Sequence, residues 1–565
     1  MARHTRFAEI LSLDQEKIIW ILFANSIILW LLTIATTHIF DFPPDTLSYT
    51  KQLSVFYWIG MVLNCVLFVA LVLGKPIQAS KKVELNHSVF VIILILYIFG
   101  TPLFIYTNPR IIDVYGYTSY AIDTVITMGY ASSPIWQWQH EYINEFPGTT
   151  VFSSMIIRVL GITTISFAKY YPLYLMFILS FLIYAISKKV AGNYALFAPV
   201  AYCSLTFVSE YNLAPQSHAL MLTTTFLLIL IPLLKFKKQD RNILIKKSVL
   251  IVLWIIIVTT HPSTPIINLL CFFVVFTICI GFEQISSSTN RYFNLPRNKL
   301  IKIGRVYRNF LLLFGVMYVA YIIYVSNFML NNIVSMSQQI MNDALTGNMF
   351  GVTAPLATHP SASYMLLYYV RWIEIIGILV LGLSSIFVLF FKSKDKTSAF
   401  IVGTLFMGYM SFSAVLVIAG ETASTYGPGR GMIFGLVPCS IIFSMVLNAK
   451  LEGRKYQIFK MILLLFIISS LLALPLARYG SDPYNFVSES EFAGMQFVSQ
   501  HPQLEITIQD FCNPAMHSSP FTNYWYNLFE LKQQRGDEYA NSFIDQHKLY
   551  DSGQCKIYQN RCNRK

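Results

Sequence analysis

The sequence predicts an all-α polytopic membrane protein, and three observations support this fold class. Hydrophobic residues make up 55% of the 565 residues and charged residues only 12%, about half the charged fraction of a typical soluble domain. Apolar stretches of roughly 20 residues recur along the chain, which is the length that crosses about 30 Å of hydrocarbon. Basic residues gather in alternate gaps between these stretches, as the positive-inside rule requires. The net charge of +13 therefore reflects topology and gives no reason to expect a nucleic-acid partner.

Thirteen segments satisfy both hydropathy and the charge pattern. They are Ile18–Ile39, Leu53–Gly74, Ser88–Tyr106, Tyr171–Ser187, Asn193–Ser209, Ser217–Leu234, Ser248–Thr260, Ile266–Gly281, Asn309–Phe328, Leu366–Phe391, Thr397–Gly420, Met432–Asn448 and Met461–Ala477. No small-residue cleavage site follows the first segment, so we expect a retained helix there and not a signal peptide. The first two segments form an N-terminal extension, residues 1–87, ahead of a transmembrane core at residues 88–477.

The charge pattern also predicts the orientation. Of the 41 Lys and Arg residues, 27 fall in gaps on one side of the segments, and six fall in the outer parts before the tail. The N-terminus is therefore expected in the cytoplasm. After an odd number of crossings, the tail at residues 478–565 is expected outside the cell membrane, as a small extracytoplasmic α/β domain with a strand near Lys556–Tyr558. Cys512, Cys555 and Cys562 lie in this tail, where one disulfide is compatible with an oxidising compartment and its pairing is open.

Two further segments lie between the spans. Thr150–Phe167 is apolar enough to suggest a span, but a crossing there would place the basic residues Lys188, Lys189 and 235–247 outside. We therefore interpret it as a helix that lies along the outer surface. Met329–Tyr364 is rich in Met, Ser and Asn and predicts a second outer loop with some helix.

The large first outer loop, residues 107–170, carries most of the candidate site residues. Four acids, one histidine, two tryptophans and several tyrosines occur within it: Asp113, Asp123, Glu141, Glu145, His140, Trp136, Trp138, Tyr115 and Tyr117, with Arg110 just before them. Aromatic faces beside carboxylates typically hold sugar rings. An interfacial aromatic belt with solvated acids is the alternative. It explains Trp136 and Trp138 well, but it explains Asp113 poorly, because Asp113 closely follows a span.

The other outer junctions add polar residues. Glu210 and Gln216 lie between the fifth and sixth segments, His261 between the seventh and eighth, and Tyr426 and Arg430 between the eleventh and twelfth. An Arg flanked by glycines at the interface suits a phosphate at headgroup level. Each also has a structural alternative: His261 before Pro262 can equally cap a helix, and Glu210 can be a solvated loop acid. For Arg371 and Glu374, three residues apart, mutual neutralisation on one helix face is the favoured interpretation.

These features together resemble the GT-C superfamily of integral-membrane glycosyltransferases. The features are an acidic residue in the first outer loop, a surface helix, a basic residue at the outer end of a late span and an outer C-terminal domain. The run Pro109-Arg110-x-x-Asp113-x-Tyr115-Gly116-Tyr117 looks like the first-loop motif of archaeal-type members, as does the run from His261 to Pro265. The tail runs 550–553 and 557–558 are similar to the ends of such proteins. Two departures are that Val114 follows Asp113, where protein O-mannosyltransferases have a second acid, and that the Trp-Trp-Asp motif of oligosaccharyltransferases is absent.

The resemblance implies transfer of a hexosyl or pentosyl group from a polyprenyl- or dolichyl-phosphate donor to a glycan, lipid or protein acceptor, with inversion. Asp113 is then the general base, and Arg430 and His261 bind the donor phosphate. Arg110, Tyr115, Tyr117, Asp123, His140, Glu141, Glu210, Gln216 and Tyr426 bind the sugar or the acceptor. The residues require no cofactor, and a divalent metal stays open because the superfamily includes members with and without one.

Three other functions compete with this one. The main alternative is a transporter or flippase of lipid-linked glycans, which would need polar groups at mid-membrane and internally related halves. Charges within the segments are scarce and no matching halves are found. The second alternative is a non-catalytic scaffold that displays the tail. The third is a polymerase or ligase of surface glycans, whose chemistry is the closest to the proposed glycosyl transfer.

Overall fold

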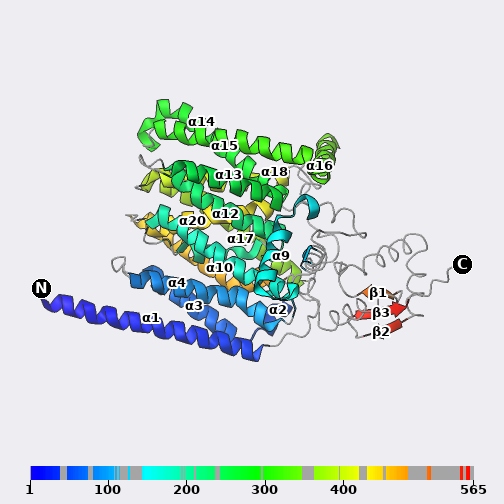
Figure 1. The fold of residues 1–565 in the computed structure, drawn as a ribbon. Coiled ribbons are helices and arrows are strands. Elements are labelled where there is room, and N and C mark those ends of the chain that lie inside the picture. The colour runs from blue at the N-terminus through cyan, green and yellow to red at the C-terminus, as the bar shows by residue number, and fades with distance from the viewer. Residues whose placement is uncertain are drawn as a thin grey trace.

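The computed structural model describes residues 2–37, 47–73, 81–106, 108–110, 114, 122, 125–126, 143–192, 195, 197–208, 211–235, 242–293, 297–346, 362–393, 395–418, 429–449, 453–480, 506–510, 548–551 and 555–559. Within these ranges the protein is a bundle of long helices with one small sheet (Figure 1). The sequence prediction of an all-α polytopic membrane protein is confirmed, because twelve described helices are long and apolar enough to cross a membrane.

The long helices lie side by side and form the bundle (Figure 1). They are α1 (Ala2–Thr36), α3 (Val55–Leu73), α4 (Lys81–Ile95) continued by the π-helical turn η1 (Leu96–Gly100) and α5 (Thr101–Ile105), α10 (Thr164–Ala191), α12 (Pro215–Leu234), α13 (Ile243–Thr260), α14 (Ser263–Phe293), α15 (Arg297–Tyr324), α17 (Ala362–Lys392), α18 (Lys396–Ile418), α20 (Gly429–Asn448) and α21 (Arg454–Tyr479). Shorter elements are α2 (Ser48–Gln52), α9 (Gly148–Leu160), α11 (Phe197–Ser204), the 3₁₀ turn η4 (Thr206–Val208) and α16 (Asn327–Thr346).

The predicted fifth span, Asn193–Ser209, is not a continuous helix. The chain forms only α11 and η4 there, and every residue of α11 is buried. The segment still crosses the bundle, because α10 and α12 end next to each other: Lys235 Nζ at the end of α12 donates to the Lys189 carbonyl at 2.7 Å. The chain must therefore return between them. Irregular backbone is tolerated at membrane depth only where protein covers it, and α11 packs among α10, α20 and α21.

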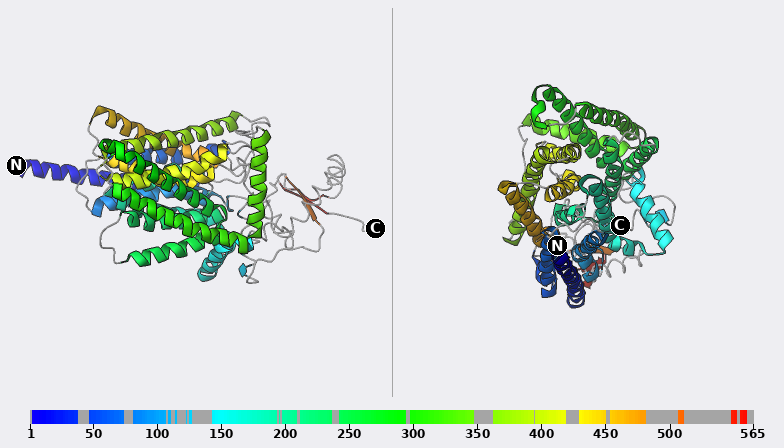
Figure 2. Two further views of the ribbon diagram at one scale, coloured as in Figure 1. Left: turned by 90° about the horizontal axis from the view of Figure 1, so that it is seen from above. Right: turned by 90° about the vertical axis from the view of Figure 1, so that its left-hand side faces the viewer.

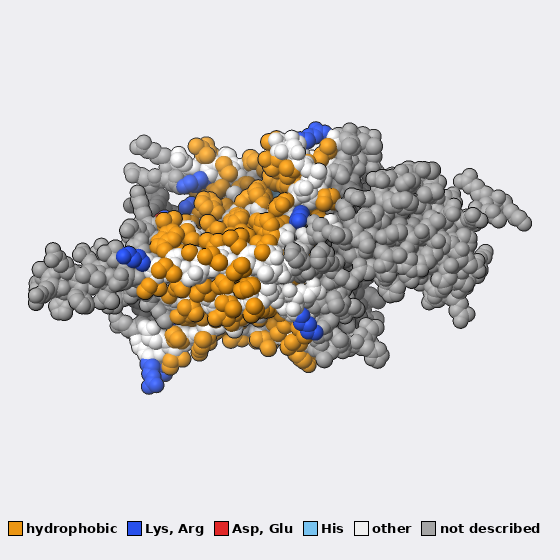
Figure 3. All heavy atoms as spheres, turned by 90° about the horizontal axis from the view of Figure 1, so that it is seen from below, with side chains coloured by type: hydrophobic (Ala, Val, Ile, Leu, Met, Phe, Trp, Pro, Cys, Tyr) orange, Lys and Arg blue, Asp and Glu red, His pale blue; other side chains and the backbone are white. Residues whose placement is uncertain are grey.

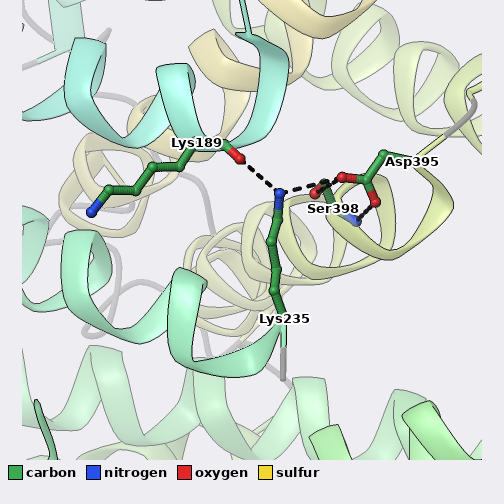
Figure 4. Close-up of polar contacts among 4 residues, drawn as sticks. All are labelled: Lys189, Lys235, Asp395 and Ser398. Carbon is green, nitrogen blue, oxygen red and sulfur yellow. Dashed lines mark hydrogen bonds and ion pairs between the residues drawn. The ribbon is translucent and has the colours of Figure 1, made fainter. Parts of the chain in front are cut away.

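Three of the gaps that the sequence assigns to the cytoplasm, after α10, after α12 and before α18, meet at one end of the bundle (Figure 4). There Lys235 also pairs with Asp395 Oδ2 at 3.3 Å, ahead of α18. The Ser398 backbone N–H donates to Asp395 Oδ1 at 3.0 Å, and the Ser398 hydroxyl donates to Oδ2. Burial raises the pKa of Asp395, but the hydrogen bonds from Ser398 and the Lys235 ammonium together lower it below its ordinary value. The Asn448 amide donates to the Ala191 carbonyl at 2.6 Å, so α20 ends here too.

The face of the bundle drawn in Figure 3 is an apolar belt with basic side chains at its margins. Exposed hydrophobic side chains on the lipid-facing helices include Ile28 of α1, Val252 of α13, Val316 of α15 and Ile373 of α17. Inside the bundle, aromatic rings link successive helices. The Trp254 and Phe314 rings stack at 4.7 Å and join α13 to α15. This arrangement is the one expected when lipid replaces water as the solvent of the bundle surface.

The end of the bundle opposite the basic gaps carries α9 and α16. The predicted surface helix Thr150–Phe167 corresponds to α9, which is too short to count as a span. Its hydroxyl side chains Thr149 and Ser153 are buried, whereas Val151 and Met155 are exposed. The helix ends at Gly161, whose φ of +64° favours glycine. Helix α10 then begins at Thr164, earlier than the predicted Tyr171.

Three strands occur in the C-terminal part of the chain: β1 (Ile506–Asp510), β2 (Lys548–Asp551) and β3 (Cys555–Gln559). They form an antiparallel sheet of order β1-β3-β2, with Ile508 opposite Ile557. The strand predicted at Lys556–Tyr558 is therefore present. The helices of the predicted α/β domain fall outside the described residues, and the division at residues 87 and 477 stays a prediction.

Candidate active site

His261 lies in the tight turn between α13 and α14, at the end of the bundle opposite the basic gaps. The side chain is only 5% exposed. Its Nδ1 is 2.8 Å from the Thr264 hydroxyl and 3.3 Å from the Ser263 hydroxyl, both in the first turn of α14. The Tyr318 hydroxyl of α15 donates to the Pro262 carbonyl at 2.7 Å. The histidine is thus held by its own turn, as the helix-capping interpretation predicts.

Arg430 lies close to this turn, in the first turn of α20. Burial and, to a smaller extent, the nearby Arg430 guanidinium together lower the pKa of His261 to about 3. The imidazole is therefore neutral at physiological pH, and Arg430 supplies the positive charge of the pair. Residues 169 positions apart in the sequence therefore lie at the same end of the bundle and interact electrostatically, whereas the sequence alone predicted only a shared membrane face.

Gly431 packs closely against α18. A Cβ on Gly431 would lie 2.6 Å from the Ser413 hydroxyl and 3.0 Å from the Tyr409 carbonyl. Tyr409 in turn donates to the Asn268 side-chain oxygen at 2.8 Å, and the Asn268 amide donates to Thr223 at 3.2 Å. Arg430 therefore stands at the start of a fixed helix. One of the two glycines that flank Arg430 therefore serves helix packing.

The end of the first outer loop is bound to the α15–α16 corner. The Ser326 hydroxyl donates to Glu145 Oε2, and the Tyr321 hydroxyl donates to the Glu145 carbonyl. Three residues later Gly148 begins α9 against the end of α13, where a Cβ would clash with the Thr260 hydroxyl. Since Thr260 precedes His261, these contacts fix the end of the loop beside the histidine turn.

The start of the same loop is bound to the end of α21. The Arg110 guanidinium lies 4.5 Å from the centre of the Tyr479 ring. Arg478 is 3% exposed, donates to the Thr206 carbonyl at 2.7 Å and lies 4.6 Å from the Phe99 ring centre. Both cations thus contact aromatic faces. Sequence reasoning missed Arg478, because a basic residue at the end of an apolar stretch usually marks only the boundary of a span. The adjoining Tyr479 was the feature that could have drawn attention to it.

Gln216 lies in the first turn of α12, at the same end of the bundle. Its amide nitrogen is buried and has no hydrogen-bond partner among the described residues. Two residues on, His218 is buried, with its Nδ1 3.4 Å from the Tyr171 hydroxyl and its ring 4.3 Å from Phe152 of α9. A buried amide donor without a partner suits a site that receives hydroxyl or carbonyl groups.

The structure describes four of the predicted site residues and leaves the others undescribed. Arg430 lies near His261, whereas Arg110 belongs to the Tyr479 contact and Gln216 to the start of α12. The candidate base Asp113 and the predicted ligands Tyr115, Tyr117, Asp123, His140, Glu141, Glu210 and Tyr426 lie outside the described residues. Their roles stay predictions.

Arg371 and Glu374 each contact α21. Arg371 Nε donates to the Ala477 carbonyl at 2.8 Å, and Glu374 accepts from the Ser470 hydroxyl at 2.6 Å. The favoured interpretation, that they neutralise each other, is therefore replaced by two separate attachments of α17 to α21. Glu374 is buried within a span, where a carboxyl group requires such a partner.

The fold defines the class of protein as a polytopic membrane protein whose spans are helical, the architecture that the GT-C resemblance implies. No protein-family model matches the sequence, and no curated protein matches it. One similar solved structure is the oligosaccharyltransferase of Archaeoglobus fulgidus tethered to an acceptor peptide, with 11% identity, a TM-score of 0.45 and coverage of 74% of this chain and 57% of that chain. Another is the Archaeoglobus fulgidus oligosaccharyltransferase AglB in complex with an inhibitory peptide and a dolichol-phosphate, with 11% identity, a TM-score of 0.42, and 74% and 58% coverage. The chain spans somewhat over half the length of both.

Proposed function

We propose that this protein is a membrane glycosyltransferase that moves a sugar from a polyprenyl-phosphate donor to an acceptor at the extracytoplasmic face. The observation that carries the proposal is that Arg430 lies near enough to the buried, neutral His261 to lower its pKa, at the end of the bundle opposite the basic gaps. Both ends of the first outer loop, at Arg110 and Glu145, are bound at this same end. The loop that carries Asp113 therefore begins and ends on the same face as the Arg430 guanidinium.

In the proposed reaction Asp113 removes the proton from the acceptor hydroxyl. The acceptor oxygen then forms a bond to the anomeric carbon, and the bond from that carbon to the phosphate oxygen breaks with inversion. The lipid phosphate leaves with an additional negative charge, which Arg430 stabilises electrostatically. A leaving group of this kind needs no general acid.

Because His261 is neutral, it acts in this proposal as a hydrogen-bond donor and not as a second cation. With Nδ1 held by the Thr264 and Ser263 hydroxyls, its Nε2 can carry the proton and donate one hydrogen bond to a phosphate oxygen. Tyr115, Tyr117, Glu141, Glu210, Asp123, His140, Gln216 and Tyr426 are proposed to contact the sugar or acceptor. A transfer reaction of the GT-C type depends on these proposed roles.

The deciding experiment incubates the purified protein with a panel of radiolabelled polyprenyl-phosphate sugars and measures transfer of label. We expect transfer from at least one donor and its loss in Asp113→Asn, which keeps the shape of the side chain and removes the base. Asp113→Glu, which keeps the carboxylate, should retain part of the rate. Equal rates for Asp113→Asn and the unaltered protein would remove the residue from the mechanism.

Arg430→Ala should lower kcat/KM for the donor lipid by about 10²-fold or more, the usual cost of losing one stabilising group. Arg430→Lys should restore part of it, because the charge is retained without the bidentate geometry. Lys455→Ala, an exposed basic residue at the opposite end of the bundle, is the matched control and should leave the rate unchanged. An unchanged dependence on donor concentration in Arg430→Ala would contradict the assignment.

A further inference from the structure

Helix α16 runs across the end of the bundle, crosswise to the long helices (Figure 2). It follows α15 directly, after a corner at Ser326, whose hydroxyl accepts from the Met329 backbone N–H at 3.3 Å and caps the new helix. The long helices are the candidate membrane spans, so their common direction is close to the membrane normal, within the usual tilt of such helices. A helix that lies crosswise at their ends therefore lies along the plane of the membrane surface.

One face of α16 is an exposed apolar stripe. Leu330, Val334, Met341 and Leu345 are 37%, 48%, 62% and 81% exposed, and their spacing of four, seven and four residues places them on one side of a helix. The opposite side carries Asn332, Ser335, Gln339 and Asn342, which are also exposed. The helix is thus amphipathic, and side chains on both of its sides are exposed.

A helix of this kind needs an apolar surface to cover its stripe. Helices of about this length gain little stability in water from propensity alone, and most take it from packing of an amphipathic face. Among the described elements, α15 is the main packing partner of α16, and Met329 in the first turn is the residue most buried. The stripe beyond that turn is exposed in the part of the chain that the structure describes.

The position of the stripe indicates what covers it. The lipid-facing side of α15 leads directly to the apolar stripe of α16. On that side of α15, Val316, Val319 and Ile323 are 68%, 53% and 53% exposed. The sequence of α16 contains a single charged residue, Asp343, so almost no charge opposes contact with hydrocarbon. We propose that α16 is an interfacial helix, with its apolar stripe among the acyl chains of the adjoining leaflet and its polar side in water.

The test measures how deep each face of α16 lies in a bilayer. In full-length protein with serine at positions 512, 555 and 562, the five remaining cysteines are buried. Val334→Cys and Leu345→Cys place a nitroxide label on the stripe, and Gln339→Cys and Asn342→Cys place it on the polar side as matched controls. All four positions are exposed, so labelling does not disturb packing. The labelled proteins are placed in nanodiscs of zwitterionic phosphatidylcholine.

Relaxation of the nitroxide by oxygen reports hydrocarbon, and relaxation by a water-soluble nickel complex reports water. At positions 334 and 345 we expect a severalfold higher ratio of oxygen to nickel accessibility than at positions 339 and 342. Equal nickel accessibility at all four positions would overturn the proposal, since the stripe would then lie in water. Shielding of positions 334 and 345 from both reagents would also overturn it, because protein, such as the tail or a second copy, would then cover the stripe.

Discussion

At the scale of single residues, burial decides what His261 can contribute. The turn between α13 and α14 encloses its ring, and Arg430 lies close by, so the protonated imidazole is strongly disfavoured. A histidine with a pKa of about 3 does not titrate across the physiological range. Any change in transfer rate near pH 6.5 must therefore arise from another group.

The His261 environment makes stability depend on pH. The unfolded histidine has a pKa of about 6.5, so below that pH the unfolded state binds a proton that the folded state does not. The free energy of unfolding should therefore fall on acidification, by on the order of 2 kcal/mol between pH 6.5 and pH 5 from this residue. His261→Asn, which keeps an acceptor for the Thr264 hydroxyl, should lose less stability over that interval. Thermal unfolding in detergent at both pH values measures this, and equal losses in the two proteins would contradict it.

Asp395 has the opposite dependence. Its folded pKa lies below the ordinary value, so its contribution is present above about pH 4 and is lost as the pH falls through the folded pKa. Asp395→Asn should lower stability at pH 7 by about 1 kcal/mol or less, because the carboxyl is half exposed, and this difference should shrink near pH 3. Glu84→Gln is the matched control, since the Glu84–Lys188 pair is solvated on both sides. A difference for Asp395→Asn that is constant across pH would argue against the ion pair.

Part of the site could be predicted from residue types alone. His261 and Arg430 are polar groups at the ends of spans, and the positive-inside rule placed both on one face, which the structure confirms. Arg478 was missed because its burial depends on Phe99, Tyr211 and Thr206, which are distant in sequence. The separate attachments of Arg371 and Glu374 likewise depend on the rotation of α17 against α21, which helical spacing does not specify.

At the scale of elements, close approach of α18 and α20 depends on Gly431. Gly431→Ala should cost about 1–3 kcal/mol, because the new methyl group meets the Tyr409 carbonyl and the Ser413 hydroxyl. It should also reduce transfer, since Arg430 moves with the helix. Gly315→Ala in α15 is the matched control: its Cβ meets nothing within 4 Å, and alanine favours the helix by about 1 kcal/mol. Chemical or thermal unfolding of both variants measures the effect, and equal stability would show that the two helices separate without cost.

The boundaries of elements were less predictable than their existence. Hydropathy identified each of the twelve long helices, because lipid-facing and buried residues are both apolar. It failed at Asn193–Ser209, where an apolar segment is buried on all sides and has no need to be one helix. Hydropathy also placed the start of α10 too late, at Tyr171, because Thr164–Tyr170 belongs to the same helix.

At the scale of the whole molecule, the sequence predicts thirteen crossings, which would place the two ends of the chain on opposite sides of the membrane. In the variant that lacks the three tail cysteines, Gln339→Cys should react with a membrane-impermeant maleimide on intact cells. Lys455→Cys should react only after permeabilisation. The opposite pattern would invert the orientation that the charge asymmetry predicts, and labelling of both positions from outside would show that the number of crossings is wrong.

The buried crossing formed by α11 and η4 has a consequence for biosynthesis. Eight helical residues are too few to span a bilayer of about 30 Å. This segment is therefore not expected to partition alone into lipid as it leaves the ribosome. Its backbone is covered by α20 and α21, which are synthesised more than two hundred residues later. The segment must therefore reach its final place only once the last hairpin has joined, which makes assembly of this protein a late, cooperative event and not a stepwise threading of helices.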